Sequence, residues 1–172
     1  MKSHELLHPQ INDREYTAFT LYFVYACVTY AIIGFSWGAL MGGIPAFRMF
    51  VDTAPHGHLV LLAHGHINLL GWVEMAIFGS LYYIIPRLVN RPIYSMLLVK
   101  IHFWMHNVGL MGMVILFTTA GVIGGYDPQP EVERTVTHLM AGVGIFGTLV
   151  LLANIIWGYN IIKTGKLGTD SQ

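Results

Sequence analysis

The sequence predicts an all-α integral membrane protein, a bundle of four transmembrane helices, and three observations support this prediction. The 172 residues are 55% hydrophobic and only 10% charged, whereas charged residues make up roughly 25% of an average soluble chain. Four apolar runs each exceed the length of about 20 residues that a helix needs to cross a bilayer. The links between these runs are short, so consecutive helices are expected to pack as antiparallel neighbours.

We expect one domain, residues 1–172, with spans at residues 17–41, 58–85, 94–123 and 135–162. The N-terminal segment, residues 1–16, is too polar for a secretory signal, so the first span is expected to remain in the mature protein. Residues that end helices or shape turns separate the runs, and these are Gly42, Gly43, Pro45, Pro55, Pro86, Pro92, Gly124, Gly125, Pro128 and Pro130.

The basic residues predict an orientation in the membrane. On one side lie seven of them: Lys2, Arg14, Arg87, Arg91, Lys100, Lys163 and Lys166. The opposite side has only Arg48 and Arg134. Because positively charged loops stay in the cytoplasm, we expect a multi-pass protein of the inner (cytoplasmic) membrane with both termini in the cytoplasm. The loops near Pro55 and Pro128 are then expected to face outward.

The charge balance and the cysteine content narrow the functional classes. Nine basic and nine acidic residues give a formal net charge of zero, which gives no sign of a nucleic-acid partner. Cys27 is the single cysteine, so an internal disulfide or a cysteine cluster for zinc or iron–sulfur is excluded. The lipid bilayer is the partner that the composition itself requires.

Ionisable side chains within the expected spans are the main functional signal, because such groups are costly at membrane depth. Six residues belong to this set: His64, His66, Glu74, His102, His106 and His138. Any one of the histidines alone is equally well explained as a neutral imidazole that is hydrogen-bonded in the core. Five histidines in one small bundle favour a haem or metal role for some of them.

Helix geometry limits which histidines can share a haem. His66 and His138 come from different spans at similar depths, whereas His66 and His106 are offset by about 8 Å. His64 and His66 are about 200° apart around a regular helix, so they cannot both reach one ligand. One of the two then faces a neighbouring helix or a second chain, and the latter would make the protein a homo-oligomer.

Two histidines of the third span and a glutamate of the second span form a further group of candidate residues. His102 and His106 are four residues apart and share a helix face, which suits either two ligands of one metal or a polar pair. Glu74 lies at about the depth of His106, and we expect it to hydrogen-bond His106 or His102. It would then tune a ligand or carry protons. A protonated Glu74 bonded to a backbone carbonyl is the alternative.

Residues 64–72, with the aromatic residues and proline of residues 82–86, resemble the second helix of haem–copper oxidase subunit I. The likeness is to the nitric oxide reductase large subunit and the cbb-type oxidases in particular. In that group a histidine followed by a short polar residue, Asn and Leu-Leu binds the low-spin haem. The match of His66, Asn68, Leu69 and Leu70 implies that His66 is this ligand, with His64 as a competitor.

The rest of the chain resembles the same family more weakly. Residues 102–109 are similar to its third helix and residues 144–154 to its fourth, so the likeness covers only the first four helices of a longer subunit. The family's second low-spin ligand, its high-spin haem ligand and its copper histidines lie beyond these helices. The second haem ligand is therefore expected to come from His138, His102, His106 or another chain.

The resemblance implies a b-type haem protein that transfers electrons, as a subunit of a respiratory or denitrification complex, with a cytochrome c or a quinol as redox partner. Whether the chain is itself an enzyme stays open. The sequence also allows a factor that handles copper or haem for an oxidase, and a haem-based gas-binding or sensing protein. A third alternative is a structural subunit with remnant histidines. Haem and copper contents of the purified protein separate the haem protein, the copper-handling factor and the structural subunit.

Overall fold

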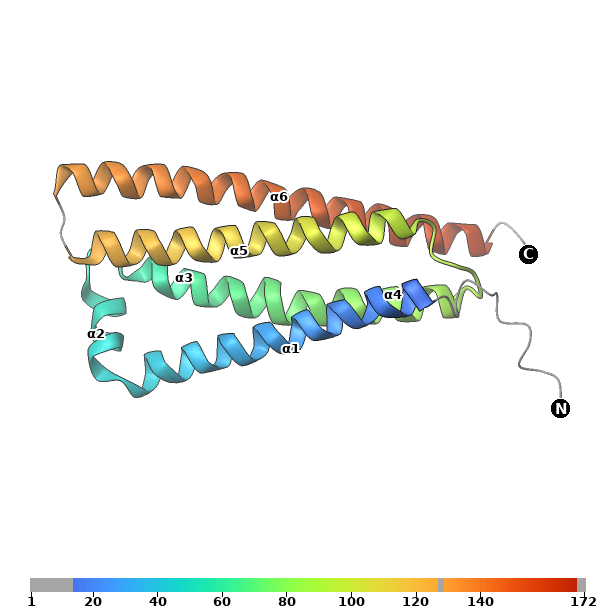
Figure 1. Ribbon diagram of the computed structural model, residues 1–172, viewed down its shortest axis with the longest axis horizontal. Coiled ribbons are helices and arrows are strands. Elements are labelled where there is room, and N and C mark those ends of the chain that lie inside the picture. Colours follow the sequence, from blue (N-terminus) through green and yellow to red (C-terminus); the bar gives the residue numbers. More distant parts are fainter. Residues whose placement is uncertain (1–13, 127–128, 170–172) are drawn as a thin grey trace.

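The all-α prediction is confirmed by a computed structural model, which describes residues 14–126 and 129–169, with side chains up to residue 166. The described residues form helices and contain no strand (Figure 1). In chain order the helical elements are α1 (Arg14–Gly43), α2 (Pro45–Thr53), α3 (His58–His66), η2 (Ile67–Val73), α4 (Glu74–Leu88), α5 (Met96–Tyr126) and α6 (Pro130–Thr169).

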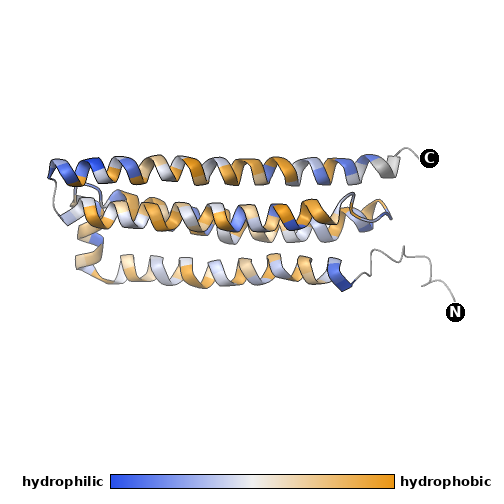
Figure 2. Ribbon diagram, turned by 45° about the horizontal axis from the view of Figure 1, so that its top comes forward, coloured by the Kyte–Doolittle hydropathy of each residue, from blue (hydrophilic) through white to orange (hydrophobic). Residues whose placement is uncertain are grey.

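Four of the helices are long and apolar enough to cross a membrane, and α3, η2 and α4 together form one of them. The others are α1, α5 and α6. The shortest has 30 residues, or about 45 Å at 1.5 Å per residue, which exceeds the roughly 30 Å hydrocarbon core of a bilayer. Figure 2 shows hydrophobic residues along the middle of α6 and hydrophilic residues towards its ends. The prediction of a four-helix integral membrane protein is therefore confirmed.

Helix α5 lies at the centre of the bundle. Half of its most apolar window is buried, against 17% for α1 and for α6. It runs beside α6 along most of its length (Figure 1) and also packs on α3. The outer helices α1 and α6 therefore leave large apolar side chains such as Ile32 and Ile145 exposed, which is the surface that lipid would cover.

Glycines allow two pairs of helices to approach closely. A Cβ atom at Gly34 on α1 would lie 2.5 Å from Oδ1 of Asn68, and one at Gly38 would lie 3.0 Å from Cε1 of His64. On α5, a Cβ at Gly112 would lie 2.4 Å from the ring of Phe146 on α6. Small residues thus position the second span against α1, and α5 against α6.

Two helix ends differ from the expected pattern. Helix α2 lies in what was expected to be a loop, and it begins at Pro45, because proline is well suited to the first turn of a helix. Helix α4 continues past Pro86 and ends at Leu88, where Asn90 takes a left-handed conformation with φ of 50°. Pro86 has no N–H to donate to the Tyr82 carbonyl, and the Tyr16 hydroxyl donates to that carbonyl instead.

Candidate functional site

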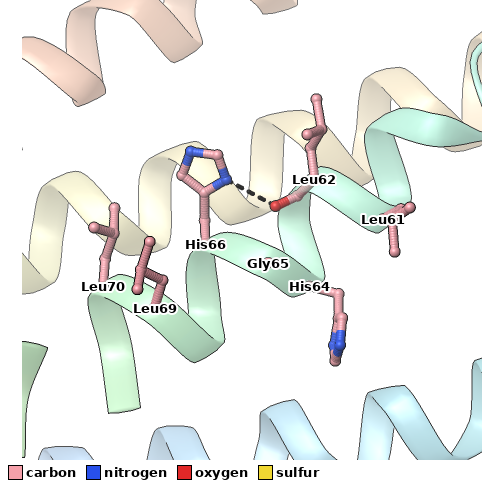
Figure 3. Close-up of a pocket in the computed structure, with 7 residues that line it drawn as sticks. All are labelled: Leu61, Leu62, His64, Gly65, His66, Leu69 and Leu70. Carbon is pink, nitrogen blue, oxygen red and sulfur yellow. Dashed lines mark hydrogen bonds between the residues drawn. The ribbon is translucent and has the colours of Figure 1, made fainter. Parts of the chain in front are cut away.

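His66, the last residue of α3, presents one free ring nitrogen. Its Nδ1–H donates a 2.7 Å hydrogen bond to the carbonyl oxygen of Leu62, one turn earlier (Figure 3). The ring lies 5.0 Å from that of Phe117 on α5, centroid to centroid. With Nδ1 protonated, Nε2 has an unshared electron pair. A histidine that ligates a metal typically has this arrangement, because the carbonyl fixes both the tautomer and the ring orientation.

An apolar groove of about 410 Å³ lies along the outside of α3 and η2, beside His66. Gly65 opens it, since a Cβ at this position would meet no atom within 4 Å. Leu69 is 60% exposed there. The groove is therefore open to a further group rather than filled by this chain. Its lining residues are Leu61, Leu62, His64, Gly65, His66, Leu69 and Leu70.

His64 points to the other side of the helix, as Figure 3 shows. Its ring faces α1, where it lies against Gly38 and 6.3 Å from the ring of Trp37. Asn68 Nδ2 donates to Nδ1 of His64 over 3.2 Å. The two histidines thus diverge as their spacing predicted, so His64 packs between helices and leaves the open nitrogen to His66.

A π-helical segment, η2, separates His66 from Glu74. The N–H of Glu74 bonds to the Leu69 carbonyl, five residues back, instead of the Leu70 carbonyl that it would use in an α-helix. The Leu70 carbonyl accepts a 3.0 Å hydrogen bond from Nε2–H of His106 on α5. Such segments occur frequently at functional sites. Here the Leu70 carbonyl within the wider turn joins the buried His106 to the backbone of the second span.

Glu74 lies beside His106, with Oε2 3.7 Å from Nε2. This distance exceeds hydrogen-bond length, and Oε2 has no hydrogen-bond partner. The side chain of Asn154 on α6 lies next to the Glu74 carboxyl group. The carboxyl group is therefore placed among α4, α5 and α6, with 28% of the side chain exposed.

His102 and His106 are fully buried in the bundle core. Their rings meet edge to face with centroids 5.9 Å apart, and Phe78 packs on both. Nδ1 of His102 lies 3.1 Å from the hydroxyl of Tyr82. Two ring nitrogens, Nε2 of His102 and Nδ1 of His106, have no partner. The shared helix face that their spacing predicted is therefore present, within an aromatic environment.

His138 is exposed on α6, and none of the hydrogen bonds, ion pairs or ring contacts in the described residues joins it to His66. Residues 14–126 and 129–169 also contain no group of three or more His, Cys, Asp or Glu side chains that could hold a metal ion. The pairing of His66 with His138 stays a prediction.

Several polar residues of the core were not singled out from the sequence. Tyr30 donates a 2.6 Å hydrogen bond to Oδ1 of Asn107, which joins α1 to α5. Asn160 on α6 is fully buried and bonds both backbone groups of Ser95. Their amide side chains inside apolar runs could have identified Asn107 and Asn160 from the sequence, because amide groups need hydrogen-bond partners in hydrocarbon.

The fold and the histidine pattern define a class, multi-pass membrane proteins with imidazole groups among their spans. The chain matches the family described as cytochrome c and quinol oxidase polypeptide I over residues 14–157, and it belongs to that family. This finding confirms the resemblance to haem–copper oxidase subunit I.

Named relatives support the assignment. Cytochrome c oxidase subunit 1 of Rhodobacter capsulatus is 31% identical over 127 residues, which cover 66% of this chain and 24% of the relative. A subunit 1 homologue of Azorhizobium caulinodans is 37% identical over 60% of this chain and 21% of its own length. The haem–copper oxidase subunit I+III of Aeropyrum pernix is 36% identical over 88% of this chain and 18% of its own. The chain thus spans about a quarter or less of these relatives' lengths.

Proposed function

We propose that this chain holds a b-type haem through His66 and transfers electrons as part of a respiratory or denitrification complex. One observation carries the proposal. The Leu62 carbonyl fixes Nδ1–H of His66, which leaves Nε2 free beside an apolar groove. Neutral imidazole with its second nitrogen bonded to a carbonyl is a good ligand for haem iron. The family membership supports the same assignment, since haem belongs to full-length members.

The residues around His66 fit a haem. Leucines would contact the apolar macrocycle, and Gly65 provides space because a Cβ there would project into an open groove. When bound, the haem would supply one-electron redox chemistry. This chain would contribute the ligand His66, the carbonyl that orients it, and an apolar wall that limits the access of water to the iron.

A second haem ligand would come from His138 or from another chain. His102 and His106 are less suited, because both are fully buried in the core and neither lines the groove. Ligation by two histidines suits electron transfer, since it leaves no open iron position for a substrate. A second chain at the groove would be another copy of this protein or a further subunit of a complex.

The membrane arrangement is part of the proposal. We place the chain in the inner membrane as one four-helix domain with both termini in the cytoplasm, in accord with the distribution of lysine and arginine. A cytochrome c or a quinol is the proposed redox partner. Several relatives are cytochrome c oxidase subunits, which favours the former.

The test is an optical spectrum of the purified protein after expression with ample haem, with pigment quantified per chain. We expect a reducible haem spectrum from the wild type and its loss in His66→Ala. His58→Ala is the matched control, because this imidazole is exposed at the start of α3 and does not line the groove, and it should keep the pigment. A colourless wild type, or full pigment with an unchanged spectrum in His66→Ala, would refute the proposal.

A further inference from the structure

A row of buried polar side chains inside the bundle is separate from the groove at His66. It runs from Tyr82 on α4 through His102 and His106 on α5 to Glu74 at the start of α4. Tyr82, His102 and His106 are fully buried. The contacts are a 3.1 Å hydrogen bond from Tyr82 to His102, a ring contact between the histidines, and 3.7 Å from His106 to Glu74.

The hydrogen bonds of His102 and His106 determine which ring nitrogen of each histidine carries the proton. With the Tyr82 hydroxyl donating to Nδ1 of His102, the proton of that neutral ring is on Nε2. His106 donates from Nε2–H to the Leu70 carbonyl, so its Nδ1 is an acceptor. The unpartnered atoms are Nε2–H of His102 and Nδ1 of His106. They are a donor and an acceptor on adjacent rings whose centroids lie 5.9 Å apart, and no hydrogen bond joins them directly.

Glu74 ends the row with a carboxyl group that has little to stabilise a negative charge. Its neighbours are His106 from α5 and Asn154 from α6. No lysine or arginine forms an ion pair with it within residues 14–126 and 129–169. An unpaired carboxylate is very costly in an apolar environment and takes up a proton instead. The protonated acid is then the favoured form of Glu74, and a carboxylate formed when its proton leaves takes up a proton again through the nearest basic group, His106.

The other end of the row leads to the segment that joins α4 to α5. The Tyr82 side chain lies near the side chain of Asn160. Asn160 in turn accepts from the Ser95 N–H and donates to the Ser95 carbonyl, each over 3.0 Å. Tyr82 is also six residues from the end of α4 at Leu88, or about 9 Å. This end of the row is therefore near water, whereas Glu74 lies deep in the second span.

We propose that Glu74 is a partly buried proton-accepting site, and that His106, His102 and Tyr82 connect it to water at the α4–α5 end of the bundle. In one transfer, water gives a proton to the Tyr82 oxygen, and the Tyr82 proton moves to Nδ1 of His102. Nε2–H of His102 passes its proton to Nδ1 of His106, and Nε2–H of His106 passes its proton to the Glu74 carboxylate. Each intermediate group gains and loses one proton, so the net result is a protonated Glu74 and a hydroxide in water.

The experiment is infrared spectroscopy of the purified, membrane-reconstituted protein during a change from H₂O to D₂O. We expect a carbonyl band of a protonated carboxylic acid that disappears in Glu74→Gln and shifts as deuterium reaches Glu74. Tyr82→Phe removes the first hydroxyl of the row, and losing one donor should slow this shift by about tenfold. His58→Phe is the matched control, because His58 is exposed at the start of α3, and its rate should equal that of the wild type.

The outcomes decide between this proposal and a purely structural row. Absence of a band that depends on Glu74, or equal rates in wild type and Tyr82→Phe, would overturn it. Should Tyr82→Phe not fold, His102→Gln interrupts the row at the next group and gives the same comparison. The measurement does not depend on iron. His66→Ala protein should show the same exchange, so failure of the haem proposal and failure of this one are distinguishable.

Discussion

The groove at His66 and the buried row around His102 contain the same side chain in opposite surroundings. His66 has one nitrogen bonded to the Leu62 carbonyl and the other beside open space. His102 and His106 are enclosed by Phe78 and by each other. An imidazole beside a groove can take a ligand from outside the chain, whereas an enclosed one can exchange only with its neighbours. The surroundings, more than the residue type, therefore underlie the two proposed roles, a ligand at His66 and relay groups at His102 and His106.

The largest expected effect tests the packed interior. Gly112→Leu would place a side chain where a Cβ already lies 2.4 Å from the Phe146 ring. Overpacking of this kind typically costs up to about 3 kcal/mol. We expect a lower temperature of unfolding in detergent, followed by circular dichroism. Gly144→Leu is the control, because a Cβ there meets nothing within 4 Å. Equal melting of the two variants would mean that α5 and α6 are not closely packed at Gly112.

An intermediate effect is expected from the polar part of the interior. Asn160→Leu leaves the N–H and the carbonyl of Ser95 without their side-chain partners. Such losses cost about 2 kcal/mol, so the variant should melt below the wild type but above Gly112→Leu. Thr148→Val is the control, since the Thr148 hydroxyl bonds only within its own helix at the surface. Wild-type melting of Asn160→Leu would show that Asn160 does not tether this segment.

The smallest effect on stability is expected at the groove. Gly65→Leu adds a side chain in open space, so the free energy of unfolding should change by no more than about 0.5 kcal/mol. The same side chain would occupy the proposed haem site, and the pigment per chain should fall. Unchanged pigment together with unchanged stability would place the haem, if present, away from this groove.

Much of this arrangement follows from helical spacing. The divergence of His64 from His66 and the common face of His102 and His106 come from the 3.6-residue period. Counting depth along two antiparallel spans brought Glu74 near His106, which is the contact seen at 3.7 Å. These results need only that the helices be regular and apolar.

Other features depended on tertiary contacts that a linear pattern does not contain. The sequence of η2 has no residue that marks a π-helical turn, and the wide turn is stabilised by His106 from another helix. Helix α4 passes through Pro86 because Tyr16, far away in sequence, satisfies the freed carbonyl. Partners such as Ser95 for Asn160 also required the positions of α5 and α6.

Helix α2 has a mechanical consequence for α1. It bridges the separated ends of α1 and α3 (Figure 1), with Val51 buried and Arg48 paired to Asp52 on its exposed side. A thinner bilayer favours greater tilt of long apolar helices. A change in the tilt of α1 would move the end of α1 that α2 connects to α3. Because α1 carries the glycines that receive His64 and Asn68, we expect the thickness of the surrounding lipid to affect the packing beside the second span.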